Sequence, residues 1–396
     1  MLEKYIPKRF ANALIKHVAA VTLFIPYYYS FSYNPYYQDF VLATFFAALF
    51  MMTVFTSWKL SFRRNGVLLC ILSVLLVAYN GYAIYINYRY HHWYGEQINI
   101  TSAFLTFIVL LAVRNGRELV DRYVILATIH LIVISNVLAL LYRALDEYSY
   151  LFFFNTEIRQ GGFPLPSKPY SWLYFHKSQY SLLLVLCIAF FVVYRHYFRN
   201  RLTYCLSQAV LIAALYFSDT YTSMAAALII FAAQFADYWF RTKWYLKLIS
   251  LAVVPVFLAY VVKALYVRIN ENRNMATLGS RTMIWEAFIG HIQEHPHGVG
   301  MEFSEPVFQV TEWFFTNNCH NVFMNHMFRF SIPVGMIFTL MFAVIIIFSI
   351  IKKFSFLTIG IWIALLIPMC MDYSLFASEL PFFLFIVYCM FFREEG

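Results

Sequence analysis

Long runs of hydrophobic residues alternate with short polar segments along the whole chain. Runs of roughly 18 residues or more recur, and each is long enough for an α-helix to cross about 30 Å of hydrocarbon. A membrane β-barrel would instead show short strands of alternating polarity. The pattern therefore predicts an all-α bundle of about twelve membrane spans, near residues 11–31, 38–58, 66–87, 99–113, 123–142, 178–195, 203–218, 221–240, 245–265, 322–350, 354–371 and 375–392.

One long polar segment, residues 266–321, interrupts this pattern. It separates an expected N-terminal bundle of about nine spans, residues 1–265, from about three C-terminal spans in residues 322–396. Within the segment, Ser280 is placed to cap a helix that begins at Arg281. Apolar residues then recur at helical spacing, so this helix is expected to be amphipathic and to rest on the bundle or on the membrane interface.

Composition agrees with a membrane protein. Only 12% of the 396 residues are charged and 62% are hydrophobic, whereas a soluble domain carries about 25% charged residues. The formal charge of +9 arises from basic clusters that fall at every second connection between the expected spans. By the positive-inside rule, both termini are expected in the cytoplasm and residues 266–321 on the outer face. The positive charge is explained by topology and anionic lipid, so it does not indicate nucleic-acid binding.

Three groups of residues in the polar segment occur in a recognisable order. Gly279-Ser280-Arg281 opens the helix that contains Trp285, the turn His295-Pro296-His297-Gly298-Val299-Gly300 follows, and His320-Asn321 precedes the next span. This ordered set resembles the shared C-terminal region of the O-antigen ligase and O-antigen polymerase family. The resemblance covers roughly 60 residues of the chain, and the span count and loop placement agree with it.

The resemblance implies a GT-C-type fold in the bacterial inner membrane, with the active site on the periplasmic face. It implies a metal-independent, inverting glycosyltransferase that needs no cofactor. The donor would be an undecaprenyl-diphosphate-linked glycan, and the acceptor lipid A-core or a further repeat unit. Membrane lipid and a chain-length regulator protein are the other partners that the resemblance brings in.

Two activities of the family remain open for this chain. A single dominant outward loop and the His320-Asn321 pair favour an O-antigen ligase. The second sizeable outward loop, residues 143–177, keeps a polymerase that joins lipid-linked repeat units as the alternative. A lipid-linked sugar transporter or flippase is a remoter alternative, because it predicts charged residues within several spans and repeat symmetry, and neither is evident.

The chemistry of such a transfer points to particular residues. Charge on the leaving diphosphate needs a planar, bidentate cation, for which Arg281 at a helix start is the candidate. The acceptor hydroxyl must lose a proton, and His320 is the candidate base, with Asn321 orienting the substrate or the ring. The structural alternatives are that Arg281 reaches to lipid headgroups and that His320 only packs at the interface.

One departure from the family pattern concerns the tight turn between the seventh and eighth spans. The family often places an arginine there, whereas this chain has Ser218-Asp219-Thr220-Tyr221. Asp219 and Tyr221 are therefore candidate substrate-binding residues, although Asp219 has an alternative role as a helix cap. The candidates for the missing positive charge are Arg143, Arg159, Lys177, Arg268 and Arg273.

The three histidines at positions 291, 295 and 297 suggest a metal site. Their spacing crosses Pro296, and they lack a carboxylate partner at helical Glu-x-x-His spacing, so the sequence predicts no metal there.

Overall fold

The computed structural model of the chain describes residues 65–90, 95–112, 120–145, 156–158, 164–166, 176–240, 242–244, 247, 259, 263, 266–267, 280–298, 308–316, 318–372, 374–375, 377 and 379–393. The expected spans 11–31 and 38–58, and most of 245–265, lie outside these residues.

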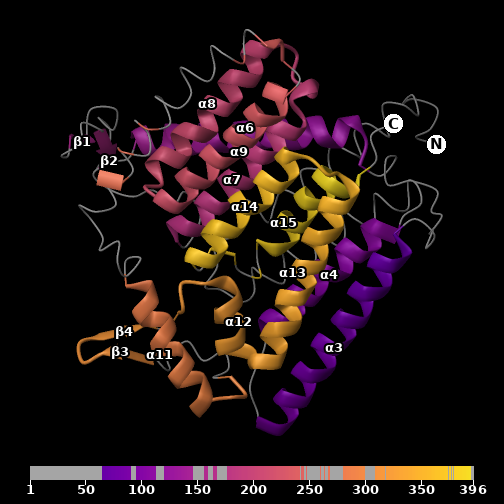
Figure 1. Cartoon of the computed structure of the whole chain (residues 1–396), viewed down its shortest axis with the longest axis vertical. Coiled ribbons are helices and arrows are strands. Elements are labelled where there is room, and N and C mark those ends of the chain that lie inside the picture. The colour runs from indigo at the N-terminus through magenta and orange to yellow at the C-terminus, as the bar shows by residue number, and fades with distance from the viewer. Residues whose placement is uncertain are drawn as a thin grey trace, which may run out of the picture.

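The described part of the chain is mainly helical (Figure 1). Two short antiparallel hairpins accompany the helices: β1 (Thr156–Ile158) pairs with β2 (Pro164–Pro166), and β3 (Phe308–Thr311) pairs with β4 (Phe314–Thr316). The longer helices are α3 (Gly66–Tyr90), α4 (Gly95–Ala112), α6 (Arg122–Leu145), α7 (Lys177–Val193), α8 (Arg201–Phe217), α9 (Tyr221–Phe240), α11 (Arg281–Glu294), α12 (Val322–Phe330), α13 (Ile332–Lys352), α14 (Phe356–Met371) and α15 (Leu380–Val387), which continues into a π-helical turn, η4 (Tyr388–Phe392).

Four of these helices are long and apolar enough to cross a membrane: α3, residues 122–141 of α6, α9 and α13. Shorter apolar helices of 10–17 residues accompany them, namely α7, α8, α14, the α15–η4 segment and residues 97–112 of α4. The predicted all-α membrane protein is thus confirmed at this level. The predicted spans 66–87, 123–142 and 221–240 each coincide with one of these long helices to within a few residues.

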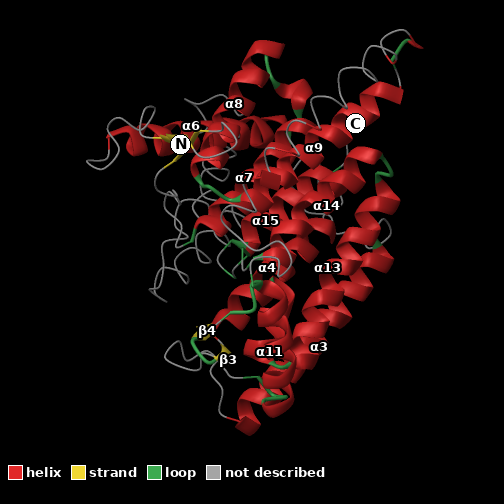
Figure 2. Ribbon diagram, turned by 60° about the vertical axis from the view of Figure 1, so that its left-hand side comes forward, coloured by secondary structure: helices red, strands yellow, loops and turns green. Residues whose placement is uncertain are grey.

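Helix α7 forms the centre of the bundle. Every residue from Ser178 to Val192 is buried, so α7 is enclosed on all sides, as the continuous apolar run after Ser181 predicts. Helix α14 packs against both α7 and α9, while α3 packs against α13 and α4 (Figure 2). The polar segments that precede α7 and follow α14 are therefore brought to the same end of the bundle.

The predicted continuous span 322–350 is wrong. The chain forms two helices, α12 and α13, which are separated at Ser331, where φ is 103°. Pro333 stands in the first turn of α13, where its missing N–H leaves no helical bond unmade. The break therefore lies inside an apolar run, and hydrophobicity alone did not reveal it.

Helix α11 begins at Arg281 as expected and ends just before His295. Its apolar face, Ile284, Phe288 and Ile292, is buried against Phe328 of α12, so the predicted amphipathic helix rests on the bundle. The predicted capping role of Ser280 is wrong. Ser280 occupies the N-cap position with a left-handed φ of 73°, and its side chain makes no capping hydrogen bond.

The turn after α11 touches the break between α12 and α13. Gly298 has a φ of 79°, and a Cβ built on it would lie 2.7 Å from the carbonyl oxygen of Arg329 and from the amide nitrogen of Ser331. Only glycine fits such a position. The Gly298 turn and the Ser331 break are therefore one packing unit.

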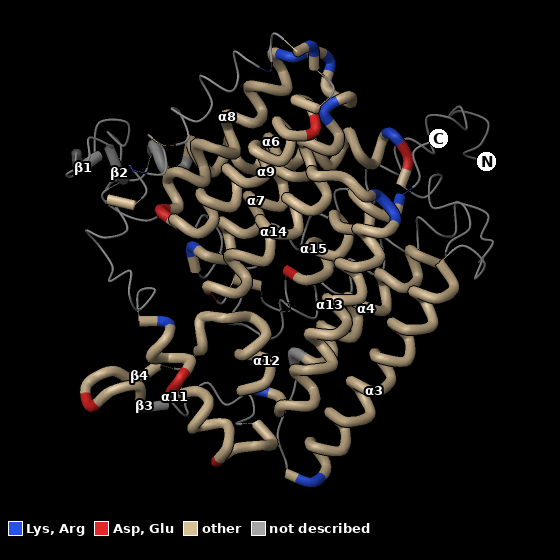
Figure 3. The backbone as a smooth tube through the Cα atoms, in the orientation of Figure 1, with Lys and Arg blue, Asp and Glu red and all other residues tan. Residues whose placement is uncertain are grey.

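Lysine and arginine gather at the end of the bundle away from α11 (Figure 3). Lys352 and Lys353 donate to the carbonyl oxygens of Phe392 and Met390, at 3.3 and 2.9 Å. Arg393 donates to the hydroxyl oxygen of Tyr197 at 3.4 Å. The basic residues after α7, α13 and η4 thus belong to one end of the molecule.

Candidate functional site

A buried carboxylate, Asp372, is the point at which four distant segments meet. It follows the last turn of α14 and is only 8% exposed. Ser178, at the start of α7, donates from Oγ to Oδ2 of Asp372 at 2.5 Å. His320 places Nδ1 at 3.1 Å from Oδ1, and Arg281 places Nη2 at 3.9 Å from Oδ2. We call Asp372, Ser178, His320 and Arg281 the Asp372 cluster.

The partners of Asp372 keep it ionised. Burial by itself raises the pKa of this carboxyl, because it disfavours the charged form. The hydrogen bonds from His320 and Ser178, with the charges of His320 and Arg281, outweigh burial and lower the pKa to about 2. Asp372 is therefore a carboxylate at neutral pH, able only to accept hydrogen bonds.

This charge state fixes the tautomer of His320. Because Asp372 only accepts, the Nδ1 of His320 that faces it carries a proton, which leaves Nε2 of the neutral ring as a base. The His320 side chain is 31% exposed, in contrast to its buried partner. The backbone N–H of His320 donates to the side-chain oxygen of Asn318 at 3.0 Å, which fixes the residue's position.

Arg281 is buried and tied to α14. The residue is 5% exposed, and its Nε donates to the carbonyl oxygen of Met371, next to Asp372 in the chain. The structure therefore places Arg281 inside the bundle, where it cannot extend to lipid headgroups in this conformation. Sequence reasoning gave Arg281 and His320 separate tasks, and the structure brings them to one carboxylate.

The segment that carries His320 is held from both sides. Trp285 of α11 donates from Nε1 to the carbonyl oxygen of Cys319 at 2.9 Å, and Asn325 of α12 accepts from the Cys319 N–H at 2.8 Å. Asn321 caps α12 by accepting from the amides of Phe323 and Met324. Because Trp285 lies in the same helix as Arg281, this bond couples α11 to the His320 segment.

Asn321 also reaches across to α14. Its Nδ2 donates to the carbonyl oxygen of Cys370 at 3.1 Å. The described contacts of Asn321 are thus with the backbone of α12 and α14. These contacts hold the start of α12 against α14, next to His320.

Lys177 is the described cation beside the turn that lacks an arginine. Its Nζ donates to the carbonyl oxygen of Asp219 at 3.1 Å and lies 3.8 Å from the carboxylate Oδ2. Lys177 directly precedes Ser178 in the chain, and Tyr221 is the first residue of α9, two positions after Asp219. The structure therefore brings Lys177, Asp219 and Tyr221 to the end of the bundle that holds the Asp372 cluster.

For the other predicted cations the structure gives no side-chain position beside this turn. Arg159, Arg268 and Arg273 lie outside the described residues, and the backbone of Arg143 lies near the end of α6.

His176 was missed by sequence reasoning. Its Nδ1 accepts from the amide of Ser178 at 3.3 Å, while its own N–H donates to Oε1 of Gln179 at 2.9 Å, which completes a capping box. Desolvation lowers the pKa of His176, the charge of Asp372 opposes this, and the charges of Lys177 and His320 lower the pKa further. The signal available in the sequence was a polar residue three positions before Gln179, directly ahead of an apolar run.

A second carboxylate lies in the same region. Glu379, just before α15, is fully buried, and Gln179 directs Nε2 at its Oε1 from 3.5 Å. Sequence reasoning assigned no role to Asp372 or Glu379. Gln179 therefore links the His176 cap to the turn that follows Asp372.

Unusual backbone conformations concentrate at this end of the bundle. Among the described residues other than glycine, those with positive φ are Asp219, Ser280, His320 and Ser331. His320 belongs to the Asp372 cluster, Ser280 adjoins Arg281, and Asp219 pairs with Lys177. Such conformations cost about 1–3 kcal/mol each and are frequent at functional sites.

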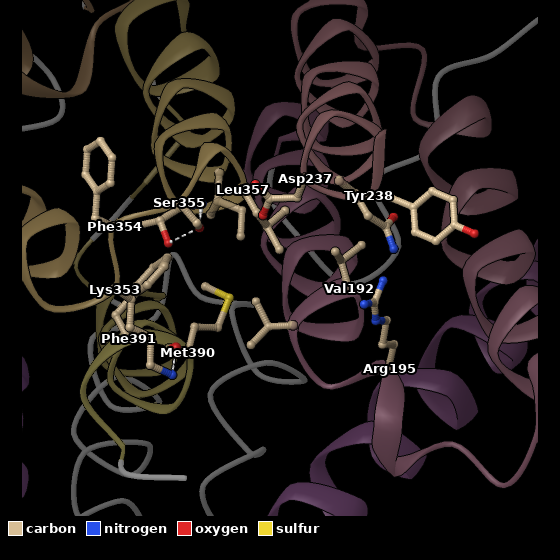
Figure 4. Close-up of a pocket in the computed structure, with 14 residues that line it drawn as sticks. Val192, Arg195, Asp237, Tyr238, Lys353, Phe354, Ser355, Leu357, Met390 and Phe391 are labelled. Atoms are coloured by element: carbon tan, nitrogen blue, oxygen red, sulfur yellow. Dashed lines mark hydrogen bonds between the residues drawn. The ribbon is translucent and has the colours of Figure 1, made fainter. Parts of the chain in front are cut away.

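A cavity of about 360 Å³ lies at the opposite end of α7 and α14 (Figure 4). It is lined by residues that include Val192, Arg195, Asp237, Lys353 and Ser355. Helices α7 and α14 have 17 and 16 residues, so their two ends are about 24–26 Å apart. The cavity is therefore separate from the Asp372 cluster.

Comparison with models of protein families and with curated proteins finds no match to this chain.

Proposed function

We propose that this chain is an integral-membrane glycosyltransferase that moves an undecaprenyl-diphosphate-linked O-antigen glycan onto lipid A-core. The observation that carries the proposal is the convergence of Arg281 and His320 on Asp372. Both residues belong to the ordered motif, and their side chains suit the needs of the reaction. Their meeting at one buried carboxylate supports a shared catalytic role.

In the proposed reaction, Nε2 of His320 takes the proton from the acceptor hydroxyl while that oxygen bonds to the anomeric carbon of the donor. The bond from this carbon to the diphosphate oxygen breaks, and undecaprenyl diphosphate leaves with its electron pair. Asp372 orients the His320 ring through Nδ1 and stabilises the imidazolium that forms. Attack opposite the leaving group inverts the anomeric configuration.

The negative charge on the leaving diphosphate is met by cations at two helix starts. Arg281 begins α11 and Lys177 begins α7. Helix N-termini favour anions, and preorganised donors at a water-poor site are worth several kcal/mol. Lys177 takes the place of the missing turn arginine, because it contacts Asp219 in that turn.

We further propose about twelve spans of GT-C type in the bacterial inner membrane, with both termini cytoplasmic and the Asp372 cluster on the periplasmic side. The separation of charge along the bundle supports this orientation. Lys352, Lys353 and Arg393 gather at the end away from α11, and basic residues favour the cytoplasmic side.

A polymerase that joins lipid-linked repeat units is the second candidate. Its support is the loop of residues 143–177, which contains the hairpin of β1 and β2. In the sequence this loop ends at Lys177, next to Ser178 of the Asp372 cluster.

The deciding experiment supplies purified protein with carrier-linked glycan and either lipid A-core or further repeat units. Glycan on lipid A-core supports the ligase, and longer carrier-linked chains support the polymerase. His320→Ala is expected to lower the initial rate about 10²–10⁴-fold, because it removes the base. The matched control is His196→Ala, an exposed histidine just past the other end of α7, which should leave the rate unchanged. The proposal would be refuted if neither acceptor gave a product, or if His320→Ala transferred glycan at the same rate as the control His196→Ala.

A further inference from the structure

The last turn of α11 brings together three metal-binding side chains that the proposed reaction does not use. His291, Glu294 and His295 place their ligand atoms within 4.8 Å of one another. The rings of the two histidines are 4.6 Å apart between centroids. We call these residues the α11 triad.

The spacing of the triad explains its geometry. His291 and His295 are four residues apart, so both rings project from one face of the helix, and Glu294 follows three residues after His291. Two histidines at this spacing on a helix are a recurrent zinc-binding arrangement. The sequence argument against metal grouped His297 with the other two histidines, but Glu294 is the third member in space.

Rotation of side chains is enough to bring the ligand atoms of the α11 triad to the spacing of a zinc site. Zinc bonds to imidazole nitrogen at about 2.0–2.1 Å in a tetrahedral site, so its ligand atoms lie roughly 3.3 Å apart. Glu294 and His295 are exposed and His291 is half-buried, which leaves two of the three side chains open to rotate. An open fourth position for water fits the exposed side of the triad.

The triad also contains one acidic side chain. Glu294 supplies a negative charge, which offsets part of the ion's charge.

The triad lies where three helices meet. The ring of His291 is 5.4 Å from that of Phe328 in α12. In the turn that follows, His297 stacks on Tyr90 of α3 at 4.1 Å and shares a 2.8 Å hydrogen bond with its hydroxyl group. An ion held here would stabilise the last turn of α11 where it packs beside α12.

We propose that His291, Glu294 and His295 bind one divalent transition-metal ion of the zinc class, which stabilises the last turn of α11. The three residues lie 10 to 14 positions after Arg281 along the helix, so the triad is about 15–21 Å from Arg281. The ion is thus distant from the proposed glycosyl transfer, and the inference stands whether or not the transferase proposal does.

The test uses the full-length chain in detergent, without a histidine tag and freed of metal by a chelator. Co²⁺ is titrated as the probe, and its visible absorption reports tetrahedral binding, with Zn²⁺ competing for the same site. One Co²⁺ per chain, displaced by Zn²⁺, is the expected result. His295→Ala and Glu294→Gln should each weaken Co²⁺ binding tenfold or more.

The controls separate the triad from other surface ligands. His130→Ala and Glu312→Gln change exposed residues away from the triad and should bind Co²⁺ like the unaltered chain. Glu294→Gln keeps the shape of the side chain, so it tests the site even if a histidine variant folds poorly. The proposal would be overturned if the unaltered chain failed to bind Co²⁺, or if both triad variants bound Co²⁺ as tightly as the unaltered chain.

Discussion

The two ends of α7 and α14 carry polar groups of very different kinds. At one end, Asp372 is buried and receives Ser178, His320 and Arg281 from separate segments. At the other end, Lys353 and its neighbours donate to backbone carbonyls beside a cavity, at the border of the apolar bundle. The first end joins carboxylate, imidazole and guanidinium groups in direct contact and has positive φ values, whereas the basic residues of the second end satisfy helix termini. This contrast distinguishes a candidate site for chemistry from a region that anchors the bundle.

The strongest test of the difference between the two ends is the substitution Asp372→Asn. The amide keeps the shape of the side chain but removes the charge that orients His320 and stabilises its protonated ring. We expect the transfer rate to fall about 10³-fold, because efficient general-base catalysis is lost. The rate is measured with purified protein and carrier-linked glycan.

The matched control for this prediction is Asp237→Asn, in α9 beside the cavity. Its rate should equal that of the unaltered chain. An equal loss in both variants would mean that the two ends do not differ in function.

A second test uses acid, and its expected effect on stability is smaller. Because the pKa of Asp372 is lowered from 3.8 to about 2, its ionised form contributes stability that is complete above about pH 4. This contribution is lost as the pH falls toward 2, and it amounts to roughly 2 kcal/mol. Thermal unfolding in detergent is followed from pH 5 to pH 2 for the unaltered chain and Asp372→Asn.

The unaltered chain should lose stability relative to Asp372→Asn within this window. A difference between the two proteins that stays constant down to pH 2 would show that the carboxylate gains nothing from its partners.

The smallest expected change in stability comes from a substitution at the other end of the bundle. Lys353→Met removes the ammonium group that donates to the carbonyl oxygen of Met390 but keeps most of the apolar stem. We expect a loss of about 1 kcal/mol in the free energy of unfolding, since one hydrogen bond is lost. The transfer rate should not change.

Unfolding by heat and the transfer assay are both run on Lys353→Met, with the exposed Lys243→Met as the control for charge. A large loss of transfer activity in Lys353→Met would contradict the assignment of chemistry to the Asp372 end alone.

Most described helices could be predicted from the sequence, because an apolar run bounded by polar residues sets the length of a helix. The start of α11 at Arg281 was also readable. The break at Ser331 was not, since it depends on a backbone contact with Gly298, which lies 33 positions earlier in the chain. Pro333 was the local sign of it.

The candidate site was predictable only in part. Arg281 and His320 stand in a motif with an order that can be read along the chain. Asp372 and Ser178 stand at the ends of apolar runs, and their pairing spans 194 positions. Such a contact is set by how α7 and α14 pack, which no local pattern in a single sequence records.

The long separation of the Asp372 partners has a consequence for biosynthesis. Ser178 is made 194 residues before Asp372, an interval of about 10–40 s at typical synthesis rates. Throughout that interval Ser178, and later Arg281 and His320, exist without the carboxylate of Asp372 that all three contact. The Asp372 cluster can therefore form only after α14 has been made and has packed against α7, so a nascent chain stalled before that point holds Ser178, Arg281 and His320 without the carboxylate that joins them.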